Sequence, residues 1–268
     1  MRIALGVEYD GTAFSGWQVQ LGQRTVQGAV EKALSVVANE TVVVHCAGRT
    51  DTGVHATWQV VHFDTSAERR THQWVMGANS NLPSDVSVIW AKACPDNFHA
   101  RFSALSRRYQ YVIFNRQYRP GLWHSKVSWE YQPLDFLPMS EAARHLVGRH
   151  DFSAFRASGC QAKSPVREVH SCEVRASGRQ IVIDVHANAF LQHMVRNIAG
   201  VLIAIGAGTR PVEWAREVLE SRDRKLAAMT ASPHGLYLCD VQYPSEFGLP
   251  NSPDFHVGQE ACQFVGLP

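Results

Sequence analysis

The six cysteines of this 268-residue chain form no C-x-x-C pair and follow no regular spacing. The pattern therefore indicates neither a disulfide framework nor a cysteine zinc site, and we expect reduced thiols. The longest apolar run, Ile198–Ile205, is too short to cross a bilayer. The first residues also have no signal-peptide layout, so we expect a cytoplasmic protein without a membrane segment.

Metal-binding motifs are missing as well. The chain has 13 histidines, but none forms an H-E-x-x-H motif or pairs with cysteines at zinc spacing. We therefore predict that the protein binds no metal.

Acidic residues are absent from one long central stretch. The formal net charge is only +2, yet no Asp or Glu occurs between Asp96 and Glu130. The basic residues of that stretch are Arg101, Arg107, Arg108, Arg116, Arg119 and Lys126. Aromatic residues alternate with them, and this combination suits RNA because cations neutralise phosphates and rings stack on unpaired bases. The ordinary alternative is a strand with core aromatics and solvated arginines.

The periodicity of the first half predicts a β-α-β-β-α-β order. Thr25 is a candidate N-cap for the first helix. The expected strands are Ile3–Tyr9, Thr41–Cys46, Gln59–Phe63 and Val86–Ala91, and the expected helices are Val26–Val37 and residues 71–80.

The second half repeats this order. Its expected strands are Tyr109–Phe114, Val169–Val174, Ile181–Ala187 and Gly235–Val241, and its helices are Ser140–Val147, one that begins near Ala189, and one near 212–221. The fold class is therefore α+β, with two ferredoxin-like units, mainly antiparallel sheets, helices on one side and a catalytic cleft between the halves. We predict units at 1–103 and 104–244, followed by a loosely packed tail at 245–268.

Asp51 lies in a short loop between Gly48 and Gly53, with Arg49 two residues upstream. Asp-Thr-Gly is typical of aspartic proteases, but these enzymes need two carboxylates that share a proton, and only one such triplet is present. A simple turn aspartate is the ordinary interpretation. The third interpretation is that Asp51 is a nucleophile, since one ionised carboxylate is enough to isomerise a bound nucleoside.

The helix expected near Ala189 has a polar stripe opposite its apolar face. The stripe consists of Gln192, His193, Arg196, Asn197 and Gly200. A solvated face is one explanation. The absence of acids from Val185 to Val212 favours a stripe that faces an anionic site.

Many ordered motifs resemble the TruA-type tRNA pseudouridine synthases over roughly residues 1 to 243. They are Gly16-Trp17-Gln18, Thr25–Gly28, Gly48–Ala56, Asn79–Pro83, Phe98–Ala104, Arg108–Tyr111, Asp151–Phe155 and Asn188–Asn197. The resemblance implies a homodimer that acts on tRNA without a metal or organic cofactor. Its targets would be uridines at positions 38 to 40 of the anticodon arm.

The resemblance also implies residue roles. Asp51 would be the nucleophile, Tyr109 would stack on the target uracil, and Arg196 would pair with the Asp51 carboxylate. Arg49 would help to displace the target nucleotide. We expect RNA contacts from Arg49, Arg101, Arg107, Arg108 and His193. The main rival of another class is a non-catalytic RNA-binding protein, which would need no arginine-paired acid.

Overall fold

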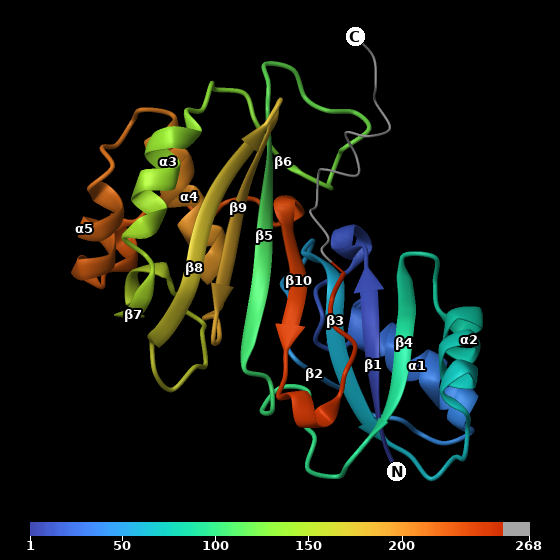
Figure 1. Ribbon diagram of the computed structural model, residues 1–268. Coiled ribbons are helices and arrows are strands. Elements are labelled where there is room, and N and C mark those ends of the chain that lie inside the picture. Colours follow the sequence, from blue (N-terminus) through green and yellow to red (C-terminus); the bar gives the residue numbers. More distant parts are fainter. Residues whose placement is uncertain (254–268) are drawn as a thin grey trace. The chain divides into compact units, whose positions relative to one another are not determined.

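A computed structural model describes residues 1–253 of the chain (Figure 1). Its described residues form two compact units, one made of Met1–Ser106 and residues 237–253 and the other of Arg107–Leu236. The division into 1–103 and 104–244 stays a prediction of domain organisation. Of the tail predicted at 245–268, residues 254–268 lie outside the described part, while Phe247 is buried beside Phe98, with ring centroids 5.2 Å apart.

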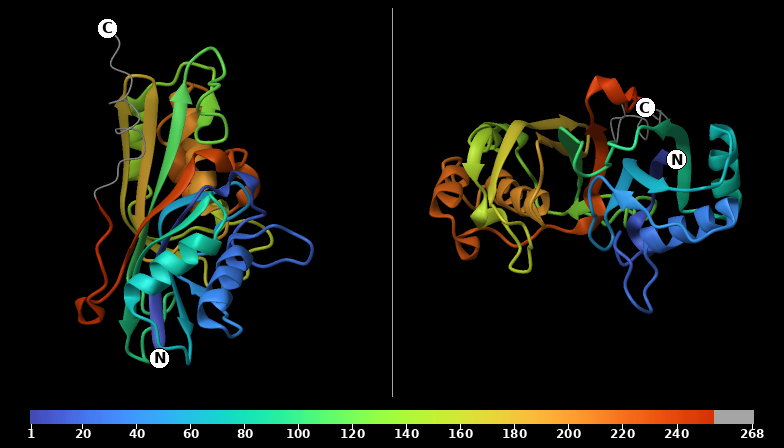
Figure 2. Two further views of the ribbon diagram at one scale, coloured as in Figure 1. Left: turned by 90° about the vertical axis from the view of Figure 1, so that its right-hand side faces the viewer. Right: turned by 90° about the horizontal axis from the view of Figure 1, so that it is seen from below.

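The first unit follows the predicted β-α-β-β-α-β order and adds one strand from the end of the chain. Its elements are β1 (Arg2–Tyr9), α1 (Val26–Ala38), β2 (His45–Cys46), β3 (His55–Asp64), α2 (Thr71–Asn81), β4 (Val86–Cys94) and β10 (Leu236–Gln242). The strands pair in the order β4-β1-β3-β10, and β2 pairs with β3. Figure 2 shows α1 and α2 on one side of these strands.

The second unit follows the order β-α-β-β-α with short additions. The strand predicted to close it, Gly235–Val241, forms β10, which pairs with β3 in the first unit. The elements of the second unit are β5 (Ser106–Asn115), β6 (Ser128–Glu130), α3 (Phe136–Arg144), β7 (Gly148–Asp151), β8 (Val166–Ser177), β9 (Gln180–Ala187), α4 (Met194–Gly206) and α5 (Trp214–Ser221). The strands pair in the order β5-β9-β8-β7, and β6 pairs with β5. Helix α3 packs on β8 and against α4.

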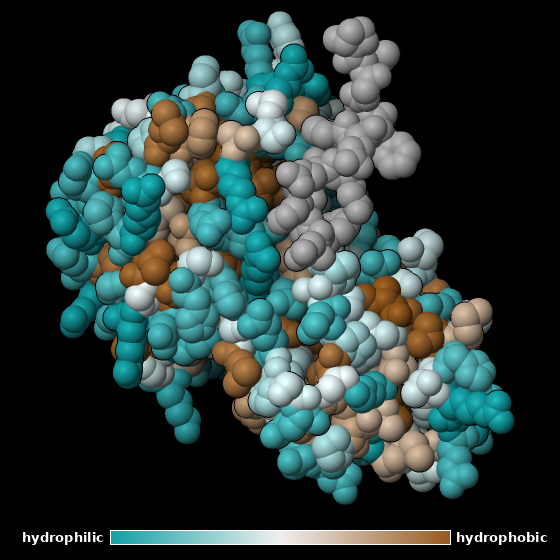
Figure 3. Space-filling model, in the orientation of Figure 1, coloured by the Kyte–Doolittle hydropathy of each residue, from teal (hydrophilic) through white to brown (hydrophobic). Residues whose placement is uncertain are grey.

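The strand pairings confirm the predicted α+β class with mainly antiparallel sheets. The pairs β1–β3, β1–β4, β5–β9, β7–β8 and β8–β9 are antiparallel, and β3–β10 and β5–β6 are parallel. On the face shown in Figure 3, hydrophilic side chains dominate and apolar ones form separate groups. Within residues 1–253, no helix has both the length and the apolar character needed to span a membrane.

The helix that follows β1 begins as predicted. Thr25 is the N-cap of α1, and its hydroxyl accepts a hydrogen bond from the Gly28 N–H at 3.4 Å. The first strand forms as predicted, and most of it has no solvent-exposed face. Residues Ile3 to Val7 are buried on both faces of β1, and a Cβ at Gly6 would lie 2.0 Å from the indole of Trp90.

The prediction of a strand at Thr41–Cys46 was wrong over most of its length, since only His45–Cys46 forms β2. Side chains of α1 take the backbone donors that a sheet would use. The Val42 N–H donates to the Ser35 hydroxyl at 2.9 Å, and the Val44 N–H donates to the Glu31 carboxylate at 3.0 Å.

Two helix starts differ from prediction. Helix α3 begins at Phe136 because the Asp135 carboxylate accepts the Leu137 N–H at 2.9 Å and caps the helix. Helix α4 begins at Met194 rather than near Ala189, because His193 has φ of +63° and cannot continue a right-handed helix. The polar stripe is therefore split between the helix and the turn before it.

Candidate active site

The Asp51 loop runs from the end of β2 to the start of β3. Asp51 is half-buried and Arg49 is exposed. The turn closes on itself, since the Val54 N–H donates to the Asp51 carbonyl at 3.1 Å, and Gly53 has φ of +78°. Glycine adopts this conformation without the steric cost that a side chain would add. Gly53 therefore permits the tight turn that follows Asp51.

Close contacts press this loop against the segment between β1 and α1. The Trp17 N–H donates to the Thr50 carbonyl at 3.0 Å. A Cβ at Gly16 would lie 2.8 Å from the same carbonyl oxygen, and a Cβ at Gly11 would lie 1.9 Å from the Val54 carbonyl oxygen. Both approaches require glycine, so the position of the Asp51 backbone is tightly defined within its unit.

Two polar side chains hold the loop from inside. The Thr50 hydroxyl lies 2.8 Å from the Tyr9 hydroxyl. Gln59 is fully buried, and its amide accepts the Gly48 N–H at 3.3 Å and donates to the Gly48 carbonyl at 2.6 Å. Both backbone polar groups of Gly48 are thus bonded by Gln59, and the backbone that carries Asp51 is held in place.

His55 starts β3 directly after the loop, and it was not among the predicted site residues. Its ring is 2% exposed and stacks on Tyr237 with centroids 4.7 Å apart. The His55 Nδ1 accepts the Gly11 N–H at 3.1 Å, and the Asp10 carboxylate lies 3.1 Å from the same nitrogen. These contacts give His55 a structural role at the exit of the loop.

The first basic residues of β5 are engaged inside their own unit. Arg107 is 8% exposed and donates to the Asn188 carbonyl at 3.1 Å. The half-buried Arg108 forms two hydrogen bonds of 2.8 Å to the Asp184 carboxylate. RNA contacts by Arg107 and Arg108 stay predictions, and both guanidinium groups already serve the fold.

Two tyrosines follow on the same strand and differ in their surroundings. Tyr111 is fully buried, and its hydroxyl donates to the Ser232 carbonyl at 2.9 Å. Burial also raises the pKa of the Tyr111 hydroxyl. Tyr109 retains 8% exposure and contacts Phe190 edge to face, with centroids 4.9 Å apart. Tyr111 is therefore the core tyrosine of the pair.

Arg196 lies in the first turn of α4 and is tied to the segment Met229–Ser232. Its Nε donates to the Ala231 carbonyl at 2.8 Å, and the Ala231 N–H donates to the Arg196 carbonyl at 3.2 Å. His193 immediately precedes the helix and is half-buried. Arg196 and His193 therefore lie close in sequence at one helix start.

The predicted catalytic residues come from both units. Asp51 belongs to the first unit, and Tyr109 and Arg196 belong to the second. The pairing of Arg196 with Asp51 stays a prediction.

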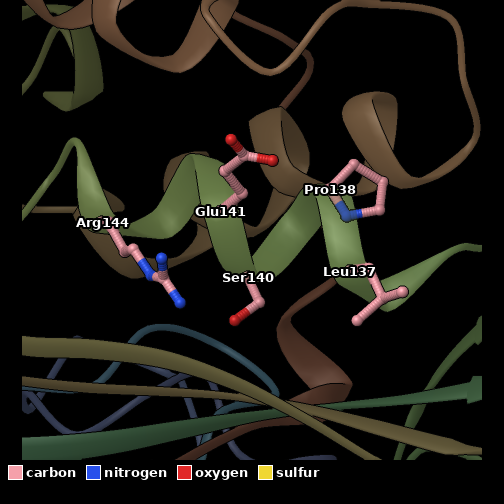
Figure 4. Close-up of a pocket in the computed structure, with 5 residues that line it drawn as sticks. All are labelled: Leu137, Pro138, Ser140, Glu141 and Arg144. Atoms are coloured by element: carbon pink, nitrogen blue, oxygen red, sulfur yellow. The ribbon is translucent and has the colours of Figure 1, made fainter.

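A surface hollow of about 360 Å³ lies on α3 and is lined by Leu137, Pro138, Ser140, Glu141 and Arg144 (Figure 4). Arg144, Ser140 and Leu137 extend to one side of the helix, and Glu141 extends to the other. None of the predicted site residues lines this hollow. Among residues 1–253, no three His, Cys, Asp or Glu side chains are grouped so that they could hold a metal ion.

The fold and the loop geometry define an α+β protein of two related units that carries one acid on a fixed turn. The model of the tRNA pseudouridine synthase family matches residues 6–103 and 142–244. The chain belongs to this family. It is an isomerase that converts uridine to pseudouridine in tRNA.

Similar proteins named tRNA pseudouridine synthase A support this assignment. The one from Alcanivorax borkumensis is 58% identical over 253 residues, covering 94% of this chain and 95% of that protein. The one from Pseudomonas aeruginosa is 59% identical over 250 residues, covering 93% of this chain and 88% of that protein. A solved structure titled "Crystal Structure of a Cbf5-Nop10-Gar1 Complex" aligns with a TM-score of 0.35 and 11% identity, covering 90% of this chain and 49% of that one. That likeness is too weak to support a statement about this protein.

Proposed function

We propose that the protein isomerises uridines at positions 38, 39 and 40 of the tRNA anticodon arm, with the Asp51 carboxylate as nucleophile. In this reaction the N1–C1′ bond of the uridine breaks and the uracil turns while it stays bound. A C5–C1′ bond then forms, C5 loses a proton and N1 gains one, so substrate and product contain the same atoms. Attack by Asp51 on C6 of the base or on C1′ of the ribose fits this balance equally.

The observation that carries the proposal is the frame around Asp51. Its loop is fixed by Thr50, Gln59 and the close approach of Gly16, while Asp51 is half-buried. A nucleophile needs a defined direction of attack, and a rigid backbone provides it before the substrate arrives. A generic surface turn requires no such set of contacts.

Supporting roles are proposed for the other candidate site residues. Tyr109 is proposed to stack on the target uracil, because Tyr111 is used inside the core. Arg196 is proposed to hold the Asp51 carboxylate in its ionised form. Arg49, Arg101, Arg107, Arg108 and His193 are proposed RNA contacts. We further propose a cytoplasmic homodimer that works without a metal or cofactor.

Asp51→Asn tests the nucleophile. The amide preserves the size of the side chain but cannot form the covalent intermediate, so we expect wild-type affinity for an unmodified tRNA transcript and a loss of pseudouridine formation of at least about 1000-fold. Thr52→Ala, at the exposed neighbouring position, serves as the control and should keep its activity. Normal turnover by Asp51→Asn would remove the carboxylate from the mechanism.

The target positions need a separate measurement. Transcripts that carry uridine at only one of positions 38, 39 or 40 are incubated with the enzyme, and pseudouridine is mapped by chemical labelling. We expect product at each of the three positions. Product confined to another arm of the tRNA would contradict this part of the proposal.

A further inference from the structure

The loop Phe98–Ser103 connects β4 to β5 and is held by two histidine rings. The Ala100 N–H donates to Nδ1 of His62 at 3.1 Å. Nδ1 of His99 accepts the N–H groups of Arg101 and Phe102 at 3.1 and 3.3 Å. The backbone at Arg101 and Phe102 is therefore fixed although both side chains are exposed.

Two phenylalanines of this loop have opposite surroundings. Phe98 is fully buried, with Tyr243 and Phe247 against its ring. Phe102 is 76% exposed. Phe102 is thus not a core residue of its unit, and the hydrophobic effect within the described chain does not explain its place.

The exposed ring of Phe102 is supported from one side. The His99 ring lies against it with centroids 4.3 Å apart and an interplanar angle of 34°. Behind His99, the His62 ring follows at 4.5 Å and the His45 ring at 5.4 Å. The Arg101 guanidinium lies 5.7 Å from the centre of the Phe102 ring. We call His99, Arg101 and Phe102 the aromatic platform.

The chemistry of this platform fits a nucleotide. A supported aromatic face stacks on an unpaired base, and a guanidinium beside it can contact the phosphate of the same nucleotide. The sequence from residue 97 to residue 129 contains no Asp or Glu, so the chain that follows the platform adds no repulsion toward RNA. Asp96 precedes it by only a few residues, and this is the one acid close by in sequence.

We propose that the aromatic platform binds an unpaired nucleotide of the tRNA other than the target uridine, with Phe102 stacked on its base and Arg101 on its phosphate. This proposal rests on tRNA as the substrate and is independent of the role of Asp51. The platform contributes affinity, and it leaves the chemical step unchanged.

The first test compares three substitutions of Phe102 by their Kd for an unmodified tRNA transcript. Stacking on a protein ring contributes about 1 to 3 kcal/mol per base, so Phe102→Ala should weaken binding by about 5- to 150-fold. Phe102→Tyr should bind within about twofold of wild type, because the ring face is kept. Phe102→Leu should behave like Phe102→Ala, since it retains apolar surface without a π face.

Controls separate stacking from damage to the fold. The melting temperature of Phe102→Ala should match that of wild type, because the side chain is 76% exposed. Met76→Ala in α2 removes another large exposed side chain of the same unit, 66% exposed, and should leave Kd unchanged. At saturating tRNA, kcat of Phe102→Ala should remain at the wild-type level.

The salt dependence of tRNA binding then separates the contribution of the Phe102 ring from that of the Arg101 guanidinium. Phe102→Ala should weaken binding at every salt concentration with an unchanged slope of log Kd against log salt. Arg101→Gln should reduce that slope by about one, the value expected for the loss of one phosphate contact.

An unchanged Kd for Phe102→Ala, or wild-type binding by Phe102→Leu, would overturn the proposal. So would a change of Phe102→Ala from dimer to monomer, because it would identify the platform as a protein interface. If Asp51→Asn turned over normally, the catalytic proposal alone would fail.

Discussion

At the scale of single residues, the Asp51 turn depends on backbone atoms more than on its own side chains. Gly16 is the clearest case, because it combines φ of +83° with a carbonyl oxygen of Thr50 only 2.8 Å from where a Cβ would be. Gly22 has a similar φ of +72° and no atom within 4 Å of that position. A side chain at Gly22 would therefore meet only the strain of a positive φ, whereas a side chain at Gly16 would meet the same strain and a steric clash.

We therefore predict unequal effects for the two alanine substitutions. Gly22→Ala should lower the free energy of unfolding by about 1 kcal/mol through backbone strain alone. Gly16→Ala should lower it by about 2 to 4 kcal/mol, because the Asp51 turn must also move. Urea unfolding measures both, and kcat should fall only in Gly16→Ala. Equal losses in the two variants would show that the close contact is not important.

His62 predicts a pH dependence of stability. Burial, followed by the nearby His99 and His45, lowers the pKa of His62 from 6.5 to about 4. The unfolded chain therefore takes up a proton near pH 6.5, while the folded protein resists until about pH 4. The free energy of unfolding should fall across this window as pH decreases, by about 3 kcal/mol.

His62→Asn provides the matched variant for this pH dependence. Its amide oxygen can accept the Ala100 N–H in place of Nδ1, but it does not titrate. Urea midpoints measured between pH 7 and pH 4 should decline less in the variant than in wild type. If the urea midpoints of the two proteins declined equally with pH, groups other than His62 would be responsible for the decline.

At the scale of elements, periodicity located the helices and strands, and local hydrogen bonding moved their ends. The run of β-branched residues from Thr41 to Val44 indicated a strand, but Ser35 and Glu31 of the preceding helix accept the N–H groups of Val42 and Val44. His193 ended the expected extension of α4 through its φ of +63°. Both effects depend on partners or conformations that apolar spacing does not record.

The segment Met229–Ser232 shows a similar limit for the candidate site. The sequence suggested Arg196, but not the segment that positions it. Ala231 contacts Arg196 through both of its backbone polar groups, and Thr230 donates to the Asn197 side chain at 2.7 Å. These contacts form between residues more than 30 positions apart, so no local motif reveals them.

Gly200 permits this segment to lie on α4. A Cβ at Gly200 would be 2.2 Å from the Met229 carbonyl oxygen. Alanine normally stabilises a helix interior by about 1 kcal/mol relative to glycine. We predict the opposite for Gly200→Ala, because Met229–Ser232 must be displaced and Arg196 loses its support.

Kinetics and melting together check the Gly200 prediction. Gly200→Ala should reduce kcat by about tenfold or more with a smaller change in KM, and it should lower the melting temperature. The comparison variant is Gly77→Ala in α2, where the nearest atoms to a Cβ belong to the Val37 side chain, at 2.9 Å, and not to a backbone carbonyl. A fully active and more stable Gly200→Ala would show that Met229–Ser232 does not position Arg196.

At the scale of the whole molecule, the class of fold followed from two repeats of one element order, and the family followed from ordered motifs. The net charge was less informative, because +2 for 268 residues gives no indication of RNA binding. What matters is the distribution. Arg49, Arg101 and Arg119 are exposed, whereas Arg107 and Arg108 are engaged with Asn188 and Asp184.

This distribution predicts a steep salt dependence of tRNA binding despite the small net charge. Each phosphate neutralised by a basic side chain releases counterions, so three or more contacts should give a slope of log K against log salt of about −2 or steeper. Filter binding from low to physiological salt measures the slope, and sucrose at matched osmolality should leave Kd unchanged. A slope near zero would mean that the exposed arginines do not contact the tRNA backbone. Affinity would then depend on stacking and base contacts alone, which salt screens far less.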